Sequence, residues 1–108
     1  MDIQTLRAFV AVADCGTVTG AARGMGYSQP GLSQRLQCLE RVVGCPLFSR
    51  DSGRMRLTTQ GRTLLPYARM IVVLSDEMRR EVPAAAAAAR GPVGAVSSAS
   101  GVRHTNSL

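Results

Sequence analysis

A polar helical face between residues 28 and 40 carries the clearest chemistry in this sequence. Ser28 is a good N-cap because its hydroxyl can accept a hydrogen bond from a first-turn backbone N–H, and Pro30 fits that turn because no N–H is needed there. Apolar residues recur on one side at helical spacing: Leu32, Leu36, Leu39 and Val43. The other side carries polar or small residues, with no carboxylate before Glu40: Pro30, Ser33, Gln34, Gln37 and Arg41. Such a helix could read base edges in a DNA major groove with its first two turns.

Catalytic and metal-binding chemistry finds little support. The three cysteines, Cys15, Cys38 and Cys45, have no CxxC spacing, and the single histidine, His104, is far from them in sequence. We expect reduced thiols in a cytosolic protein and neither a metal site nor a disulfide framework. Paired carboxylates, a phosphate-cradling glycine loop and a nucleophile with its base are also missing from the sequence, so we expect no enzymatic activity and no cofactor.

The charge is strongly positive and comes entirely from arginine. Thirteen basic and seven acidic residues give a net charge of +6 over 108 residues. Guanidinium groups suit bidentate contact with phosphate and guanine, but such a charge can equally belong to a solvated surface. The N-terminus has no basic region leading into an apolar one, and no run of about 18 apolar residues occurs, so we expect no membrane partner.

Two helices precede the polar helix. Asp2 should cap the first helix, which should end at Gly16. The residues of this helix that should face the core are Ile3, Leu6, Phe9, Val10 and Ala13. Thr17 should cap a short second helix with Val18, Ala21, Ala22 and Met25 inward. A small residue at Ala22, a turn glycine at Gly26 and a plug at Leu32 together indicate a helix-turn-helix. The alternative is a plain αα-hairpin in a small bundle.

A basic hairpin should follow the third helix, which ends at Gly44. Residues 48–50 and 54–57 alternate around the loop 51–53, which is typical of a β-hairpin. Its arms carry Arg50, Arg54 and Arg56. Beside a helix-turn-helix these arginines form a wing that can touch phosphates or enter the minor groove. Alternatively the hairpin only closes the core and leaves them in solvent.

Thr58 should cap a fourth helix running from Thr59 to about Glu81, which the alanines at 84–89 could extend and the prolines at 66 and 83 could kink. Its apolar stripe comprises Leu64, Leu65, Ala68, Ile71, Val72, Ser75, Met78 and Val82. The helix is longer than so small a core needs, so the far part of the stripe should be covered by a partner subunit. The small, polar residues after Arg90 should form a disordered tail.

At this point the chain resembles, over residues 1–82, the N-terminal half of the LysR-type transcriptional regulators. The matching blocks are LRAFVAVA (6–13), GTVTGAA (16–22), SQPGLS (28–33), LE (39–40), GCPLFSR (44–50) and LTTQG (57–61). The resemblance implies a mainly α fold: a winged helix-turn-helix with a three-helix core and short β-hairpin wing, then a long linker helix that dimerises. It also implies a C-terminal effector-binding domain of periplasmic-binding-protein type.

Matched positions give the expected contacts. The resemblance assigns base and phosphate contacts to Gln29, Pro30 and Ser33, specificity to Gln34, and phosphate contact to Thr19. The full expected DNA-binding set is Thr19, Ser28, Gln29, Pro30, Ser33, Gln34, Gln37, Arg50 and Arg54, and the expected dimerisation set is Leu64, Ile71, Val72, Met78 and Val82. Three departures stand out: Gly31 replaces the usual Ala, which weakens a helix by up to about 1 kcal/mol; Gln37 and Cys38 replace frequent basic residues; and Tyr27 replaces an aliphatic one.

The expected organisation is a DNA-binding domain over 1–58, a dimerisation helix over 59–90 and a flexible tail over 91–108. The tail resembles the first strand and loop of the effector domain, and one strand cannot form that domain, so we expect the sensor half and its small-molecule pocket to be absent from this chain. The leading hypothesis is a dimeric, sequence-specific regulator that binds double-stranded DNA at the cytoplasmic nucleoid. The alternative is an interaction protein that heterodimerises with full-length relatives through the linker helix.

Overall fold

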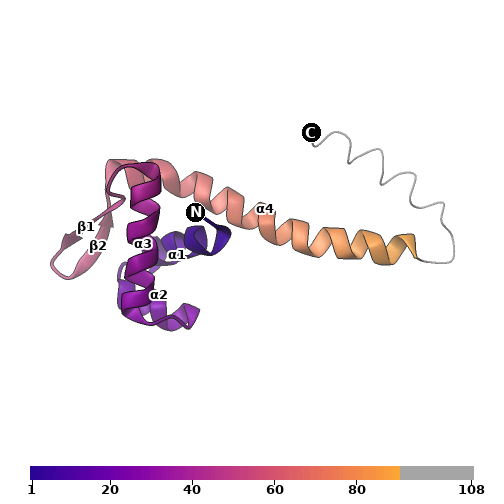
Figure 1. The fold of residues 1–108 in the computed structure, drawn as a ribbon, viewed down its shortest axis with the longest axis horizontal. Helices are drawn as coiled ribbons and strands as arrows, with labels where there is room; N and C mark the ends of the chain where they lie inside the picture. The colour runs from indigo at the N-terminus through magenta and orange to yellow at the C-terminus, as the bar shows by residue number, and fades with distance from the viewer. Residues whose placement is uncertain (91–108) are drawn as a thin grey trace. The chain divides into compact units, whose positions relative to one another are not determined.

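The computed structural model describes residues 1–90, and the predicted tail at 91–108 lies outside them. Its elements are α1 (Ile3–Cys15), α2 (Val18–Met25), α3 (Gln29–Val43), β1 (Phe48–Asp51), β2 (Arg54–Leu57) and α4 (Thr59–Ala89) (Figure 1). The mainly α fold with a three-helix core and a hairpin wing is confirmed. By packing, Met1–Val73 forms one unit and a second begins at Leu74. The functional boundary at residue 58 stays a prediction, since packing and function need not divide a chain at the same point.

The predicted capping residues begin the four helices. Each accepts a hydrogen bond from a backbone N–H three residues later: Asp2 from Thr5 at 2.9 Å, Thr17 from Gly20 at 3.1 Å, Ser28 from Gly31 at 3.1 Å and Thr58 from Gly61 at 3.0 Å. The turn between α2 and α3 depends on Gly26, whose φ of 75° lies in the left-handed region that other residues rarely adopt. The helix boundaries are therefore set locally, by short-range chemistry that the sequence displays.

The core lies among the three short helices, the loop before β1 and the start of α4. Its buried apolar residues are Leu6, Ala8, Phe9, Val12, Val18, Ala21, Ala22, Leu32, Leu36, Leu39, Leu47 and Ala68. The predicted stripe of α1 is confirmed at Leu6 and Phe9, which are buried, and Ile3 and Val10 pack half-buried against the same core. The prediction was incomplete, because it missed the buried residues Thr5, Ala8 and Val12. Neighbours cover α1 over a broader face than one stripe. The prediction that Val43 belongs to the core-facing stripe of α3 was wrong, because Val43 is the last residue of the helix and is 38% exposed.

The hairpin is antiparallel and pairs Phe48 with Leu57 and Asp51 with Arg54. Asp51 thus belongs to β1, not to the loop as predicted, and the turn consists of Ser52 and Gly53 alone. Both have positive φ, 54° and 79°, as a tight type I′ turn requires. The peptide N–H of Met55 donates to the carbonyl of Gly16 at 2.9 Å, which ties the hairpin to the end of α1.

Glu40 fixes the segment that leads from α3 into the wing. Its carboxylate accepts hydrogen bonds from the backbone N–H groups of Leu47 and Phe48, at 2.7 and 3.3 Å. The ring of Phe48 then packs on that of Phe9, with centroids 5.3 Å apart. One carboxylate on α3 and one aromatic pair therefore hold the wing's first strand in place.

α4 continues through both prolines and through the alanine run to Ala89, so the extension beyond Glu81 is confirmed. At Gly61 a Cβ would collide with the carbonyl oxygen of Leu47, so this position permits the close approach of α4 to the core. Two of the residues expected to dimerise, Leu64 and Val72, pack half-buried against the core of their own chain, and their role in dimerisation stays a prediction. Ala68 is buried and Leu65 also packs against this core, so the exposed residues of the predicted stripe are Ile71, Met78 and Val82.

Candidate nucleic-acid interface

A hollow of about 330 Å³ lies between the start of α2 and the wing. Among the residues lining it are Thr17, Thr19, Gly20, Arg23, Gln29 and Arg50. The hollow is therefore lined by three residues that were predicted from separate parts of the sequence. Thr19 belongs to α2, Gln29 to the first turn of α3 and Arg50 to the wing. The geometry brings Thr19, Gln29 and Arg50 together as the winged helix-turn-helix hypothesis requires.

The chemistry of this hollow suits an anionic oxygen. The N-terminal end of α2, where the helix dipole is positive, lines the hollow, although the Gly20 N–H there already donates to the Thr17 hydroxyl oxygen. Arg23 and Arg50 add positive charge beside the Thr19 hydroxyl. Sequence reasoning missed Arg23, although its position four residues after Thr19 in one helix predicts that the two lie on the same face.

A second, smaller hollow of about 180 Å³ runs between α3 and the hairpin. Ser33, Gln37 and Arg50 line it, so Arg50 borders both hollows. Glu40 lines it too, but its carboxylate already accepts the two N–H groups that anchor the wing. Gln37, which is exposed, and Ser33, which is half-buried, thus border the same hollow as the cationic side chain of Arg50.

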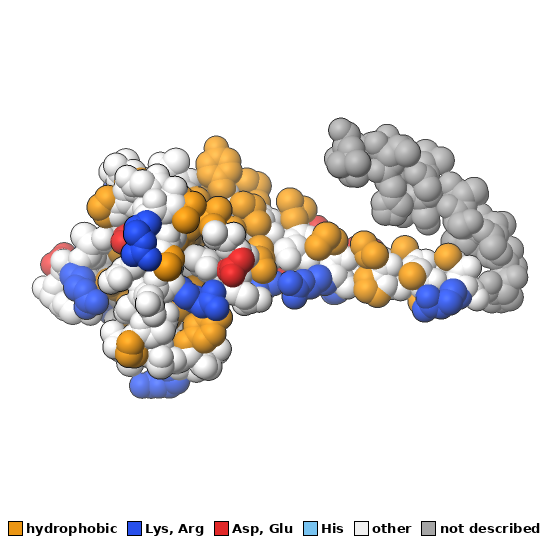
Figure 2. All heavy atoms as spheres, in the orientation of Figure 1, with side chains coloured by type: hydrophobic (Ala, Val, Ile, Leu, Met, Phe, Trp, Pro, Cys, Tyr) orange, Lys and Arg blue, Asp and Glu red, His pale blue; other side chains and the backbone are white. Residues whose placement is uncertain are grey.

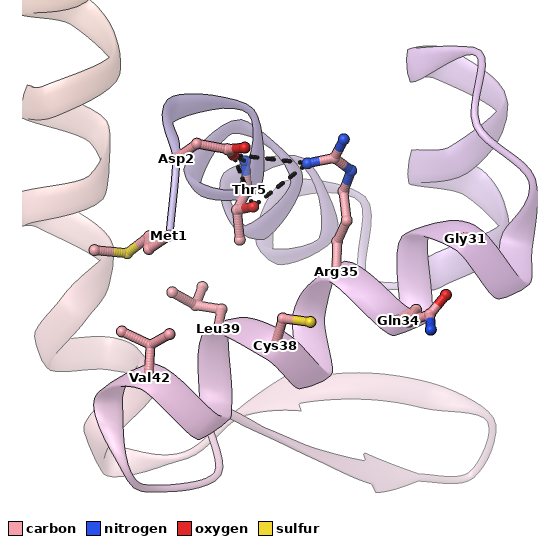
Figure 3. A pocket seen from close by; sticks show the side chains of 9 residues that line it. All are labelled: Met1, Asp2, Thr5, Gly31, Gln34, Arg35, Cys38, Leu39 and Val42. Carbon is pink, nitrogen blue, oxygen red and sulfur yellow. Dashed lines mark hydrogen bonds and ion pairs between the residues drawn. The ribbon is translucent and has the colours of Figure 1, made fainter.

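The remaining recognition residues lie apart from these hollows. Pro30 is exposed in the first turn of α3, and Ser28 is exposed with its hydroxyl engaged as the N-cap. Gln34 borders a different pocket, on the side of α3 that faces the start of α1 (Figure 3). The predicted set therefore spreads around the first two turns of α3 and does not form a single cluster.

The three wing arginines differ in their surroundings. The guanidinium of Arg54 lies so close to Gly16 that a Cβ there would collide with its Nη2 atom. Nε of Arg56 pairs with the Asp51 carboxylate across the hairpin at 2.8 Å. Arg50 is the wing arginine that lines both hollows. The hairpin pattern alone offered all three as wing residues, and the family resemblance then selected Arg50 and Arg54. Neither the Gly16 contact nor the cross-strand pair is visible in spacing alone.

The resolved pKa shifts lie away from these hollows. Hydrogen bonds from the Thr5 N–H and hydroxyl, together with Arg35, hold the pKa of the Asp2 carboxyl below its ordinary value. Hydrogen bonding to Asp14 raises the pKa of Arg69, in a two-point contact of 2.6 and 3.2 Å. Within residues 1–90 no group of His, Cys, Asp and Glu is placed to hold a metal ion. Over the same part of the chain, no helix has the length and apolar character needed to cross a membrane.

The three-helix core, the capped third helix and the arginine-bearing hairpin define a winged helix-turn-helix domain. The model of the bacterial regulatory helix-turn-helix protein, lysR family, matches residues 3–62, and the chain belongs to that family. The chain is 41% identical over 87 residues to the small neutral protease regulatory protein of Streptomyces coelicolor, covering 81% of this chain and 26% of that protein. It is 41% identical over 86 residues to the transcriptional regulator TfdT of Cupriavidus pinatubonensis, covering 80% of this chain and 38% of that one.

Solved structures agree with this assignment. CbnR DBD in complex with DNA superposes with a TM-score of 0.75 at 34% identity, covering 80% of this chain and 99% of that one. The BenM DBD complex with benA site 1 DNA gives a TM-score of 0.75 at 32% identity, covering 80% of this chain and 97% of that one. The chain therefore matches nearly the whole of these domains while spanning 26% of the Streptomyces regulator.

Proposed function

We propose that this chain binds double-stranded DNA as the DNA-contacting part of a LysR-type transcriptional regulator, without enzymatic activity. The observation that carries the proposal is the hollow shared by α2, α3 and the wing, where Thr19, Gln29 and Arg50 meet. A phosphate there would hold the domain on the duplex while the start of α3 enters the major groove. The CbnR and BenM domains, similar over four-fifths of this chain, were solved with DNA. Because the partner is DNA, the proposed place of action is the cytoplasmic nucleoid.

The residues divide into two roles under this proposal. Base edges are read from the start of α3 by Gln29, Pro30, Ser33, Gln34 and Gln37. Phosphates are held by Thr19, Ser28, Arg50 and Arg54, to which the structure adds Arg23. Phosphate contacts position the protein on the duplex, whereas base contacts supply discrimination between sequences. Variants of the two groups should therefore behave differently.

We propose further that two copies associate through α4. Ile71, Met78 and Val82 are 44%, 57% and 59% exposed, and the hydrophobic side chains are visible along α4 in Figure 2. Tyr67 and Leu74, which the sequence prediction omitted, are 58% and 61% exposed. The spacing 67, 71, 74, 78 and 82 is that of one helix face, and a second copy of the same face would cover it. Residues 59–90 would then act as the dimerisation helix. No observation favours a full-length relative over a second copy as the partner.

DNA binding is tested by titrating the 108-residue chain into labelled duplex at several salt concentrations. One duplex carries an inverted repeat with a T-N11-A core, the type of site that the family resemblance suggests, and the other is its shuffled counterpart. Arg50→Ala should weaken binding to both duplexes and reduce the salt slope by about 1, because one phosphate contact is lost. Gln29→Ala should lower the preference for the first duplex and leave the slope unchanged.

Arg80→Ala is the matched control, since it removes an exposed arginine far along α4. It should bind as the unmodified chain does. Absence of binding at low salt would reject the proposal. Equal binding to both duplexes, across a range of selected sequences, would reduce it to non-specific attraction.

A further inference from the structure

Arg35 lies on the side of α3 that faces α1, away from the side that carries Ser33 and Gln37. Its Nη1 is 3.4 Å from the hydroxyl oxygen of Thr5 and 3.6 Å from a carboxylate oxygen of Asp2. Figure 3 shows the guanidinium reaching across the pocket from α3 toward these two side chains. Its Cζ is also 5.1 Å from the centroid of the Tyr27 ring, within the range of a cation–π contact.

The partners of Arg35 are themselves held in place. The Asp2 carboxylate accepts hydrogen bonds from both the backbone N–H and the hydroxyl of Thr5, each at 2.9 Å. Thr5, at 6% exposure, is the one buried polar residue among those that the structure describes. Tyr27 is half-buried in the turn before α3, and its N–H donates to the Ala22 carbonyl at 3.0 Å. The guanidinium thus joins two fixed points, the first turn of α1 and the helix-turn-helix turn.

The apolar contacts of α3 lack this directional character, and its other directional contact, from Glu40 to the N–H groups of Leu47 and Phe48, holds the far end of the helix to the wing. Leu32, Leu36 and Leu39 bury one stripe of the helix, but apolar burial depends on area and only weakly on angle. A helix that reads base edges must hold its side chains to about 0.5 Å, which requires directional support from neighbouring residues. Between α3 and the start of α1, the hydrogen bond and the ion pair of Arg35 supply directional support of this kind.

We propose that Arg35 is a positioning residue for base recognition. Through Tyr27, Thr5 and Asp2 it fixes the orientation of the first two turns of α3, and it does so without touching DNA. This inference rests on the proposed DNA binding and assigns part of its sequence discrimination to a cluster behind the recognition surface. A direct phosphate contact by Arg35 is the rival role, and the salt dependence of binding separates the two.

The test is Arg35→Met, which keeps the length of the side chain and removes its cation. Binding to the inverted-repeat duplex should weaken about fivefold, in line with the usual strength of an exposed cation–π contact together with a weak ion pair. Binding to the shuffled duplex and the salt slope should stay unchanged. Arg35→Lys should recover part of the discrimination because it keeps a cation over Tyr27, and Tyr27→Leu should resemble Arg35→Met. Arg80→Met is the control, and it should change neither the discrimination between the two duplexes nor the salt slope.

Hydrogen exchange without DNA provides a measurement that does not depend on binding. In Arg35→Met the amides of the first two turns of α3 should exchange about fivefold faster, while those of the hairpin stay as they were, and circular dichroism should show a folded chain. Unchanged discrimination with unchanged exchange would overturn the proposal, as would equal losses on both duplexes with a salt slope reduced by about 1. If the unmodified chain binds neither duplex, the proposed function fails, and the exchange experiment alone decides whether Arg35 orients α3.

Discussion

α3 and α4 carry the same kind of apolar stripe, and the fold uses the two stripes in different ways. On α3, Leu32, Leu36 and Leu39 are at most 5% exposed. On α4, Met78 and Val82 are 57% and 59% exposed. Helical spacing of apolar residues therefore identifies an amphipathic helix, but it does not say whether its own chain or another molecule covers the stripe.

The difference follows from where each helix lies. α3 has 15 residues and contributes its whole middle section to the three-helix core. α4 has 31 residues, of which only Gly61 and Ala68 are buried, and the packing unit that contains the core ends at Val73. A core built by about 70 residues has a limited apolar surface to offer, so a long helix leaves part of its stripe outside it.

The largest expected effect is on the covered stripe. Leu32→Ala removes a fully buried side chain from the centre of the core, so the free energy of unfolding should fall by about 3 kcal/mol. Urea unfolding followed by circular dichroism measures this loss. Leu74→Ala, at a 61% exposed position of α4, is the control and should change stability by less than about 0.5 kcal/mol at low protein concentration. Equal losses for the two would remove the distinction between the helices.

A substitution on the exposed apolar stripe of α4 should weaken the association of two chains and should leave the folding of each chain unchanged. Met78→Asp places a charge on the proposed dimer face, so the dimer dissociation constant should rise about thirtyfold, which corresponds to about 2 kcal/mol. Analytical ultracentrifugation over a concentration series measures the change, with Arg80→Asp as the control on another face of α4. A dimer that persists unchanged in Met78→Asp would show that α4 does not form the interface.

A smaller effect is expected where α3 holds the wing. Glu40→Gln keeps the shape of the side chain but loses the charge that strengthens its two bonds from Leu47 and Phe48. Stability should fall by about 1 kcal/mol, and amides of β1 should exchange faster with solvent. Gln37→Glu, at an exposed position of the same helix, is a control for the change between the two side-chain types. No change in β1 exchange would mean that the Phe9–Phe48 packing alone anchors the wing.

The smallest effect concerns pH and the cap of α1. Because the folded-state pKa of Asp2 is depressed, its contribution to stability is present above the unfolded pKa of 3.8 and is lost as pH falls through the folded value. Asp2→Asn should therefore lose a little stability at pH 6 and show a shallower decline in melting temperature between pH 5 and 3. Glu81→Gln, at an exposed position of α4, is the control for removing a carboxylate. Identical pH profiles for the unmodified chain and Asp2→Asn would contradict the assignment.

The sequence predicted the caps, the helix-turn-helix and the hairpin because each depends on residues within a few positions of one another. Ser28 caps α3 through the N–H of Gly31, and Gly26 allows the turn before it, without help from distant segments. The same spacing indicated which side of α3 is polar, and hence Ser33, Gln34 and Gln37 as candidates, whereas Gln29 came from the resemblance to the LysR-type regulators. It could not show that Thr19 and Arg50, 31 positions apart, border one hollow.

What the sequence determined by itself is thus local: where helices start and stop, and which helices are amphipathic. Only the tertiary structure decided which groups surround each arginine. Arg50 lines the hollows, Arg56 pairs with Asp51, and Arg35 reaches the start of α1. A guanidinium takes its role from the acceptors and rings within a few ångströms, and folding brings those from distant parts of the chain. For the same reason only packing showed that Leu64 and Val72 contact the core of their own chain.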